Sequence, residues 1–188
     1  MMNRDDALKL LELHLPNKNL IKHSIAVEAG MRKMAEFLGE KDVERWAMSG
    51  LLHDLDYEKT KDDFPKHGLV TGEILKKEGF DDTEILDALV MHSGNIPATT
   101  AMGKALYAVD PTTGFLTACV LMSPTKNIHF LDTGFMMKRF KEKRFAAGAN
   151  REQIASATEN FPLSLEDFIT IVHEGMKESS AELGLGTL

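Results

Sequence analysis

Four histidines and two aspartates form an ordered series along the chain, and side chains of these types can ligate a metal ion. In chain order the series is His23, His53-Asp54, His67, His92 and Asp110. The His53-Asp54 pair ends an apolar segment that contains Trp46 and Leu51. A histidine and a carboxylate in such a setting need partners, because an unpaired buried charge is costly. A shared divalent ion meets that need, and these donors suit manganese, iron, cobalt, nickel or zinc.

Helical periodicity dominates the segments that must position these residues. We predict helices at about residues 6–15, 19–38, 41–55, 65–78, 82–92, 98–122, 132–145, 151–160 and 164–181. Ser164 and Asp167 predict a capping box for the last helix. The charged residues 56–64 indicate a loop, and strand signals are nearly absent. The predicted fold class is all-α, as a single-domain helical bundle.

Composition narrows the functional classes. The 188 residues are 43% hydrophobic and 27% charged, which is typical of one globular domain with a real core. The net charge of -7 argues against a protein that coats a nucleic-acid polymer, because phosphate neutralisation needs a basic surface. The single cysteine, Cys119, excludes an internal disulfide and a thiolate-rich zinc site.

The chain also carries few signs of export or membrane insertion. Its first residues are charged, and no run approaches the ~18 apolar residues of a membrane span. We therefore expect a cytoplasmic protein without a membrane partner.

The order H…HD…H…H…D resembles the metal signature of the HD superfamily of phosphohydrolases, which has an all-helical fold. Residues 19–24, 50–58, 66–68, 105–110 and 138–148 are also similar to a subfamily of stand-alone predicted HD hydrolases. The resemblance spans about residues 5–178. It implies one HD domain over residues 1–188, with a metal-binding core at about 17–125 and C-terminal helices at about 130–182 packed on it.

Carried over by position, the resemblance implies a metal ion held by His23, His53, Asp54 and Asp110. His67 and His92 match two extra histidines of dinuclear members, in which the aspartate of the HD pair bridges both ions. The expected cofactor is therefore one or two divalent transition-metal ions. Residues 67–110 are more distantly similar to HD-type symmetric diadenosine-tetraphosphate hydrolases. The chain lacks their lysine after the HD pair and their basic residue after the last aspartate, so a diadenosine substrate is not indicated.

Asp110 has a competing structural interpretation. The sequence Asp-Pro-Thr-Thr is typical of a helix start, with Asp110 as N-cap and Pro111 at the first helical position. The resemblance instead places Asp110 on a helix as a ligand. A local kink at Pro111 would accommodate both interpretations.

The implied activity is hydrolysis of a phosphoester or phosphoanhydride in a small, phosphorylated substrate, nucleotides included, by metal-activated water. Asp54 and Asp56 are the candidate catalytic residues. Asp54 would bridge the ions, whereas Asp56 either supports a ligand histidine or is a plain loop acid. The candidate phosphate-binding cations are Lys126, Arg139 and Lys143, although a basic run such as residues 138–144 is usually a solvated helix face.

Two other functional classes stay open. Some HD proteins with the same ligand series bind two irons and catalyse oxygen-dependent cleavage, and imidazole and carboxylate donors fit both chemistries. A non-catalytic nucleotide-binding module would keep the fold, but such a module is expected to lose ligands, and this chain carries all six. The substrate, the native metal and the oligomeric state, a homodimer included, are left undetermined by the sequence.

Overall fold

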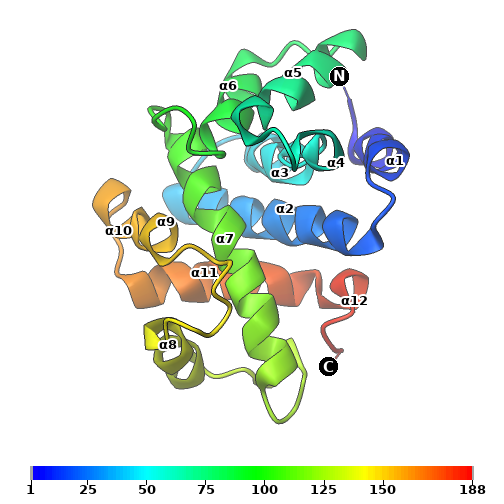
Figure 1. The fold of residues 1–188 in the computed structure, drawn as a ribbon. Coiled ribbons are helices and arrows are strands. Elements are labelled where there is room, and N and C mark those ends of the chain that lie inside the picture. The colour runs from blue at the N-terminus through cyan, green and yellow to red at the C-terminus, as the bar shows by residue number, and fades with distance from the viewer. Residues whose placement is uncertain (1, 188) are drawn as a thin grey trace.

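The computed structural model describes residues 2–187, which form helices and no strand (Figure 1). The α-helices are α1 Arg4–His14, α2 Lys18–Leu38, α3 Val43–Leu52, α4 Tyr57–Thr60, α5 Leu69–Lys77, α6 Thr83–Met91, α7 Ala101–Met122, α8 Thr133–Lys141, α9 Arg151–Ala155, α10 Ala157–Asn160, α11 Leu165–Glu178 and α12 Ser180–Leu183. Two short 3-10 helices, η1 Phe64–Lys66 and η2 Ile128–Phe130, lie between them. The predicted all-α fold class is confirmed.

Polar N-cap residues set where several helices begin. Asp42 accepts the backbone N–H of Arg45 at the start of α3, and Asp82 accepts that of Ile85 at the start of α6. At α11 the predicted capping box forms between Ser164 and Asp167, each accepting a backbone N–H of the other. These caps fix the first turns of α3 and α6, whose opposite ends carry candidate metal ligands.

The helix α2 lies at the centre of the bundle. It packs against α3 on one side and α11 on the other, and α7 crosses in front of α2 and α11 (Figure 1). Two glycines permit the close crossings. A Cβ on Gly50 of α3 would lie 2.7 Å from the carbonyl oxygen of Val27 in α2, and a Cβ on Gly175 of α11 would collide with the Ala29 carbonyl. Close packing here brings the ends of α3 and α6 against α2 and α7.

The structure differs from the predicted helices in several places, and the segments predicted as 151–160 and 164–181 are each divided into two helices. Residues 57–60 form the single turn α4 within the predicted loop, and α5 begins at Leu69 instead of Pro65, because Gly68 takes a left-handed φ of 82°. The predicted helix 132–145 ends at Lys141, and turns follow it. The helix α7 runs without a break through Pro111, so the interpretation of Asp110 as a helix N-cap is wrong.

The same helix corrects one expectation about membranes. Among the described residues, α7 is long and apolar enough to span a bilayer by length and composition alone. However, 56% of its most apolar stretch is buried inside the protein, against α2, α6, α9 and α11. It also carries Lys104 and Asp110. A core helix of a globular bundle has these properties, and we interpret α7 as one.

Candidate metal centre

The six residues of the predicted series meet where several helices end. His53 and Asp54 directly follow α3, and His92 directly follows α6. His67 follows η1, His23 lies in α2, and Asp110 lies in the middle of α7. Residues that span almost ninety positions of sequence therefore share one site in the bundle.

A first group of donor atoms surrounds the Nε2 atom of His23. This atom lies 3.0 Å from Oδ1 of Asp110 and 3.2 Å from Nε2 of His53. The His53 Nε2 atom in turn lies 3.6 Å from Oδ1 of Asp110. Asp54 turns its Oδ2 atom toward this group, at 3.5 Å from His53 and 3.7 Å from His23. Four residues thus direct one donor atom each at the same point.

A second group of donor atoms lies on the other side of Asp54. The Nε2 atoms of His67 and His92 are 3.1 Å apart. Oδ1 of Asp54 lies 3.1 Å from the first of these atoms and 3.7 Å from the second. Asp54 therefore faces one histidine pair with each of its carboxylate oxygens, which is the arrangement expected of a carboxylate between two ions.

The other nitrogen of each imidazole already has a partner. Nδ1 of His53 donates to the carbonyl oxygen of Gly50 at 2.7 Å, and Nδ1 of His92 donates to that of Leu89 at 2.6 Å. Nδ1 of His67 lies 2.8 Å from Oδ1 of Asp56. A proton held at Nδ1 leaves the Nε2 lone pair free, so these hydrogen bonds select the tautomer that can ligate a metal ion.

Asp56 is a buried acceptor behind His67, outside the donor cluster. Its side chain is 0% exposed, and its Oδ2 atom accepts the backbone N–H groups of Gly68 and Thr71, each at 2.9 Å. Its Oδ1 atom is directed at His67 and at the Thr60 hydroxyl. Of the two interpretations of Asp56 from the sequence, the structure agrees with the one in which it supports a ligand histidine. Asp56 is not placed to touch a substrate, contrary to its prediction as a catalytic residue.

Charge within the cluster perturbs the pKa values of its members. Burial acts to lower the pKa of His53, but Asp54 and Asp110 outweigh it and raise that pKa to about 9. Burial is likewise outweighed at His67, where Asp54 and Asp56 raise the pKa to about 10. Burial raises the pKa of the Asp54 and Asp110 carboxyls, but the histidines beside them prevail and hold both values below the ordinary range. The site thus concentrates negative charge that a cation would neutralise.

These donors fit divalent metal ions. Two of the donor groups, His23-His53-Asp110 and His53-Asp54-His92, each bring one atom per residue within 4.8 Å of the others. Two ligands at about 2.1 Å from one ion lie roughly 3.0–3.4 Å apart, and the two closest Nε2 pairs lie at 3.2 and 3.1 Å. Cys119 contributes nothing, since it is buried in α7, where burial raises its pKa to about 12.

One side of the cluster opens into a cavity of about 330 Å³. His23, Asp110, Pro111 and Gly114 form one part of its lining, and residues 146–149 supply Ala146, Gly148 and Ala149 as the other part. The side chains of His23 and Asp110 are 25% and 26% exposed, whereas that of Asp54 is only 10% exposed. A substrate would therefore reach the donor cluster from the His23 and Asp110 side.

The three predicted phosphate-binding cations differ in their relation to this cavity. Lys143 is exposed on the turns that follow α8, three residues before Ala146 in the cavity wall. Arg139 is bonded to Glu142 at 2.7 Å and lies over the Phe135 and Phe145 rings. Lys126 follows the far end of α7, which ends about 18 Å along the helix axis from Asp110. Lys143 thus lies on the segment that leads to the cavity wall, whereas Lys126 lies far from the cavity along α7.

Two of the supporting contacts were not predicted from the sequence. Thr113 lies one turn after Asp110, and its hydroxyl is 3.3 Å from Nδ1 of His23. Arg151 donates hydrogen bonds to the carbonyl oxygens of Phe140, Phe145, Ala146 and Ala149, so it holds the segment that walls the cavity. Spacing of i, i+3 from Asp110 could have indicated Thr113. Arg151 was indistinguishable from a surface residue at the start of a helix.

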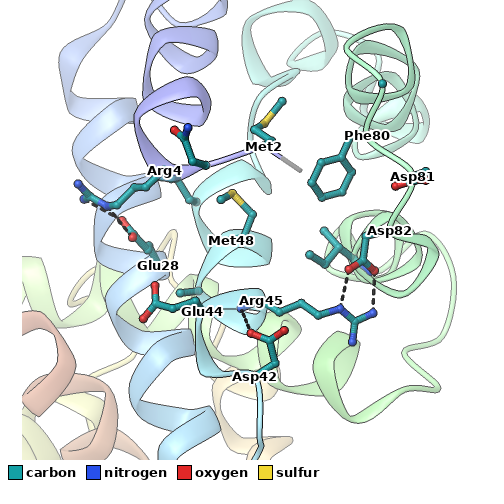
Figure 2. A pocket seen from close by; sticks show the side chains of 15 residues that line it. Met2, Arg4, Glu28, Asp42, Glu44, Arg45, Met48, Phe80, Asp81 and Asp82 are labelled. Atoms are coloured by element: carbon teal, nitrogen blue, oxygen red, sulfur yellow. Dashed lines mark hydrogen bonds and ion pairs between the residues drawn. The ribbon is translucent and has the colours of Figure 1, made fainter.

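A larger cavity, of about 750 Å³, lies elsewhere in the bundle (Figure 2). It is lined from α1, α2, α3 and the residues before α6, and none of the six donor residues lines it. Ion pairs between Arg4 and Glu28 and between Arg45 and Asp82 lie along it. Because its charges are largely paired and no metal-ligating cluster faces it, it is not the candidate reaction site.

The fold and the donor series agree with a comparison against known families. The profile of the HD domain matches residues 20–120, which is more than half of the chain and includes all six donor residues. The chain belongs to the HD domain family, a superfamily of metal-dependent phosphohydrolases.

Three relatives illustrate how far the similarity extends. Ribonuclease Y of Nitratidesulfovibrio vulgaris is 31% identical over 98 residues, which are 52% of this chain and 18% of the relative. Ribonuclease Y of Oleidesulfovibrio alaskensis is 29% identical over 98 residues, which again are 52% of this chain and 18% of the relative. An uncharacterized protein of Methanocaldococcus jannaschii is 34% identical over 85 residues, which are 43% of this chain and 48% of the relative. This chain thus spans less than half the length of each relative, and no solved structure matches it.

Proposed function

We propose that this protein is a metal-dependent phosphohydrolase that cleaves a phosphoester or phosphoanhydride bond in a small phosphorylated substrate. The observation that carries the proposal is the position of Asp54, whose two oxygens face two separate histidine pairs. This arrangement suits two divalent ions on either side of one carboxylate. Manganese, iron, cobalt, nickel and zinc are the candidates, because imidazole and carboxylate are their common ligands.

The protein residues divide the work of the reaction. His23, His53, Asp54 and Asp110 would hold one ion, and His67, His92 and Asp54 the other. When bound, such ions lower the pKa of water and neutralise the charge of a phosphoryl group. A water oxygen then bonds to phosphorus as the bond from phosphorus to the leaving oxygen breaks, and the leaving oxygen takes up a proton.

The residues around the donor cluster would position both the ligands and the substrate. Asp56 keeps His67 in its ligating tautomer, and Gly50 and Leu89 do the same for the other two buried histidines. Lys143 offers a cation with no ion pair within the described residues, on the segment that leads to the cavity wall. A lysine there would attract the anionic substrate to the open side of the cluster.

The partner we propose is a small molecule, with no membrane and no nucleic-acid polymer, and the compartment is the cytoplasm. The net charge of -7 disfavours a long polyanion as partner. Two of the relatives are named Ribonuclease Y, so a phosphodiester belongs on the list of bonds to test.

The test is release of hydrolysis products, separated by chromatography so that cleavage without free phosphate is detected, from phosphomonoesters, phosphodiesters, nucleotides and dinucleotides, with each candidate metal supplied in turn. The variants His53→Ala and Asp54→Ala should lose all turnover, since each removes a central donor. His14→Ala is the matched control, because His14 lies in α1 outside the cluster, and it should keep full activity. Absence of release with every metal would sink the hydrolase proposal. Oxygen consumption that depends on bound iron would replace it with the oxygenase class.

A further inference from the structure

A further cavity, of about 250 Å³, is lined by Tyr107, one helical turn before Asp110 in α7, and has no role in the function proposed above. Gly94, Ile96 and Pro97 form one wall, α7 supplies Lys104 and Tyr107, and α10 supplies Asn160. Gly94 comes two residues after His92, so this wall begins at the second histidine pair. Its volume corresponds to roughly eight waters at liquid density, which is enough for a phosphate with a small attached group.

The cavity and the donor cluster lie along one helix face. Lys104, Tyr107, Pro111 and Gly114 follow at spacings of three, four and three residues, which places them on one stripe of α7. The first two line this cavity, and the last two line the 330 Å³ cavity beside Asp110. At 1.5 Å per residue, Tyr107 lies about 4.5 Å and Lys104 about 9 Å along the axis from Asp110.

Lys104 gives the cavity its charge. Its side chain is half-buried, and no carboxylate lies within 4.0 Å of it among the described residues. No acidic side chain lines the cavity. On a protein with a net charge of -7, a half-buried lysine without a counter-ion favours an anion as ligand.

The ring of Tyr107 lies between this cation and Asp110. It is half-buried and contacts the backbone at Gly94, where an added Cβ would lie 3.3 Å from the ring. The opposite wall is tied down, because Nδ2 of Asn95 donates to the carbonyl oxygen of Phe64 at 2.9 Å. An aromatic side chain held in this way offers a surface for a sugar or base.

We propose that this cavity binds the distal part of the substrate, which carries a second phosphate paired with Lys104 and a sugar or nucleoside against Tyr107. The inference rests on the proposed function, since the reacting phosphate is the one at the donor cluster. An axial offset of about 9 Å between Lys104 and Asp110 favours two phosphates separated by a sugar over adjacent phosphates of one chain, which share an oxygen. The substrate class is therefore a bisphosphate whose two phosphate groups flank a sugar or a nucleoside.

Steady-state turnover by the metal-loaded full chain tests this class with two matched probes. Adenosine 3′,5′-bisphosphate should show a kcat/KM at least tenfold above that of adenosine 5′-monophosphate, the size expected of one charge-assisted hydrogen bond. Lys104→Gln should raise KM for the bisphosphate about tenfold and so remove the advantage of the bisphosphate over the monophosphate in kcat/KM. Lys126→Gln is the matched control and should leave kcat and KM unchanged for both probes. Tyr107→Leu should weaken the binding of both probes, because both carry the nucleoside.

A binding measurement separates this inference from the proposed function. Titration calorimetry of the bisphosphate is made with Asp54→Asn, which should not turn it over, and with Asp54→Asn combined with Lys104→Gln. The dissociation constant should rise about tenfold in the double variant. Equal turnover of both probes, with no effect of Lys104 on KM or binding, overturns the cavity assignment and leaves the hydrolase standing. Binding that depends on Lys104 without any turnover supports the cavity and overturns the hydrolase.

Discussion

Asp56→Asn should remove His67 from the ligand set without changing the shape of the site. The Oδ2 atom of Asp56 accepts two backbone N–H groups at 2.9 Å each, so the single oxygen of the new amide should occupy that position. The amide nitrogen, a donor, then faces Nδ1 of His67, where Oδ1 now lies at 2.8 Å. Two donors cannot pair, so the imidazole must move its proton to Nε2 to accept at Nδ1. With that proton in place, Nε2 cannot bind a metal ion.

The expected loss follows from what remains of each ion's ligands. The ion between His67, His92 and Asp54 would lose one of three protein donors, and changes to such supporting partners cost about 10–100-fold in metal affinity. The ion held by His23, His53 and Asp110 keeps its full set and should bind with unchanged affinity. The variant should therefore bind one ion as tightly as the parent and the second ion about 10–100-fold more weakly.

Metal titration by calorimetry, with the bound metal counted by elemental analysis, measures both affinities. Asp62→Asn is the matched control, because Asp62 is an exposed acid in the same segment and should leave both affinities intact. Two unchanged binding events in Asp56→Asn would refute the tautomer argument. Weakening of both ions together would instead indicate general damage to the fold, which the melting temperature would reveal.

Three further predictions concern pH, the cavity wall and the helix crossing. The pKa values of His53 and His67 are raised to about 9 and about 10. In metal-free protein, their contribution to stability is therefore fully present below the ordinary pKa of 6.5 and is lost as the pH rises through about 9 and 10. Metal ions compete with these protons, so the metal-induced rise in melting temperature should grow from pH 6.5 to 9, and a constant rise would contradict this. Arg151→Lys should raise KM several-fold with little change in the melting temperature of the core. One ammonium cannot replace the guanidinium hydrogen bonds to four carbonyl oxygens. Proteolysis within residues 142–149 should therefore be faster in this variant. Gly50→Ala should lower the free energy of unfolding in urea by about 1–3 kcal/mol, because its Cβ would lie 2.7 Å from a backbone oxygen of α2, whereas Gly114→Ala, with open space around it, should be neutral or stabilising.

Local chemistry in the sequence was enough to predict most of the helices. Side chains such as Asp82 and Ser164 cap the first turn of the helix that follows them, and this contact depends on residues three positions apart. Apolar residues at helical spacing predicted the core face in the same way. The turns between residues 56 and 68 were less predictable, because α4 and η1 are single turns with little periodicity of their own.

The series of six donor residues was also recognisable from the sequence, since its order and residue types resemble a known metal signature. Their meeting point was not, because it depends on how α2, α3, α6 and α7 cross. The local pattern at Asp110 and Pro111 even favoured a helix start, whereas packing on α2 and α6 holds α7 continuous through the proline. Tertiary packing outweighs a local preference here, because the buried contacts along this 22-residue helix offset the roughly 3 kcal/mol that a proline costs inside a helix.

Charge patterns in the sequence were the weakest guide to the site. Lys126, Arg139 and Lys143 are equivalent as basic residues of the sequence, yet only the segment carrying Lys143 continues into the cavity wall, and nothing in the sequence distinguishes Lys104. Asp56 looked like a loop acid until its burial behind His67 was visible. The sequence alone therefore determined the fold class, through contacts between near neighbours, and predicted the donor set through an ordered motif. Only the tertiary structure decided which charges face the donors, because a side chain's reach and burial depend on helices brought together from distant parts of the chain.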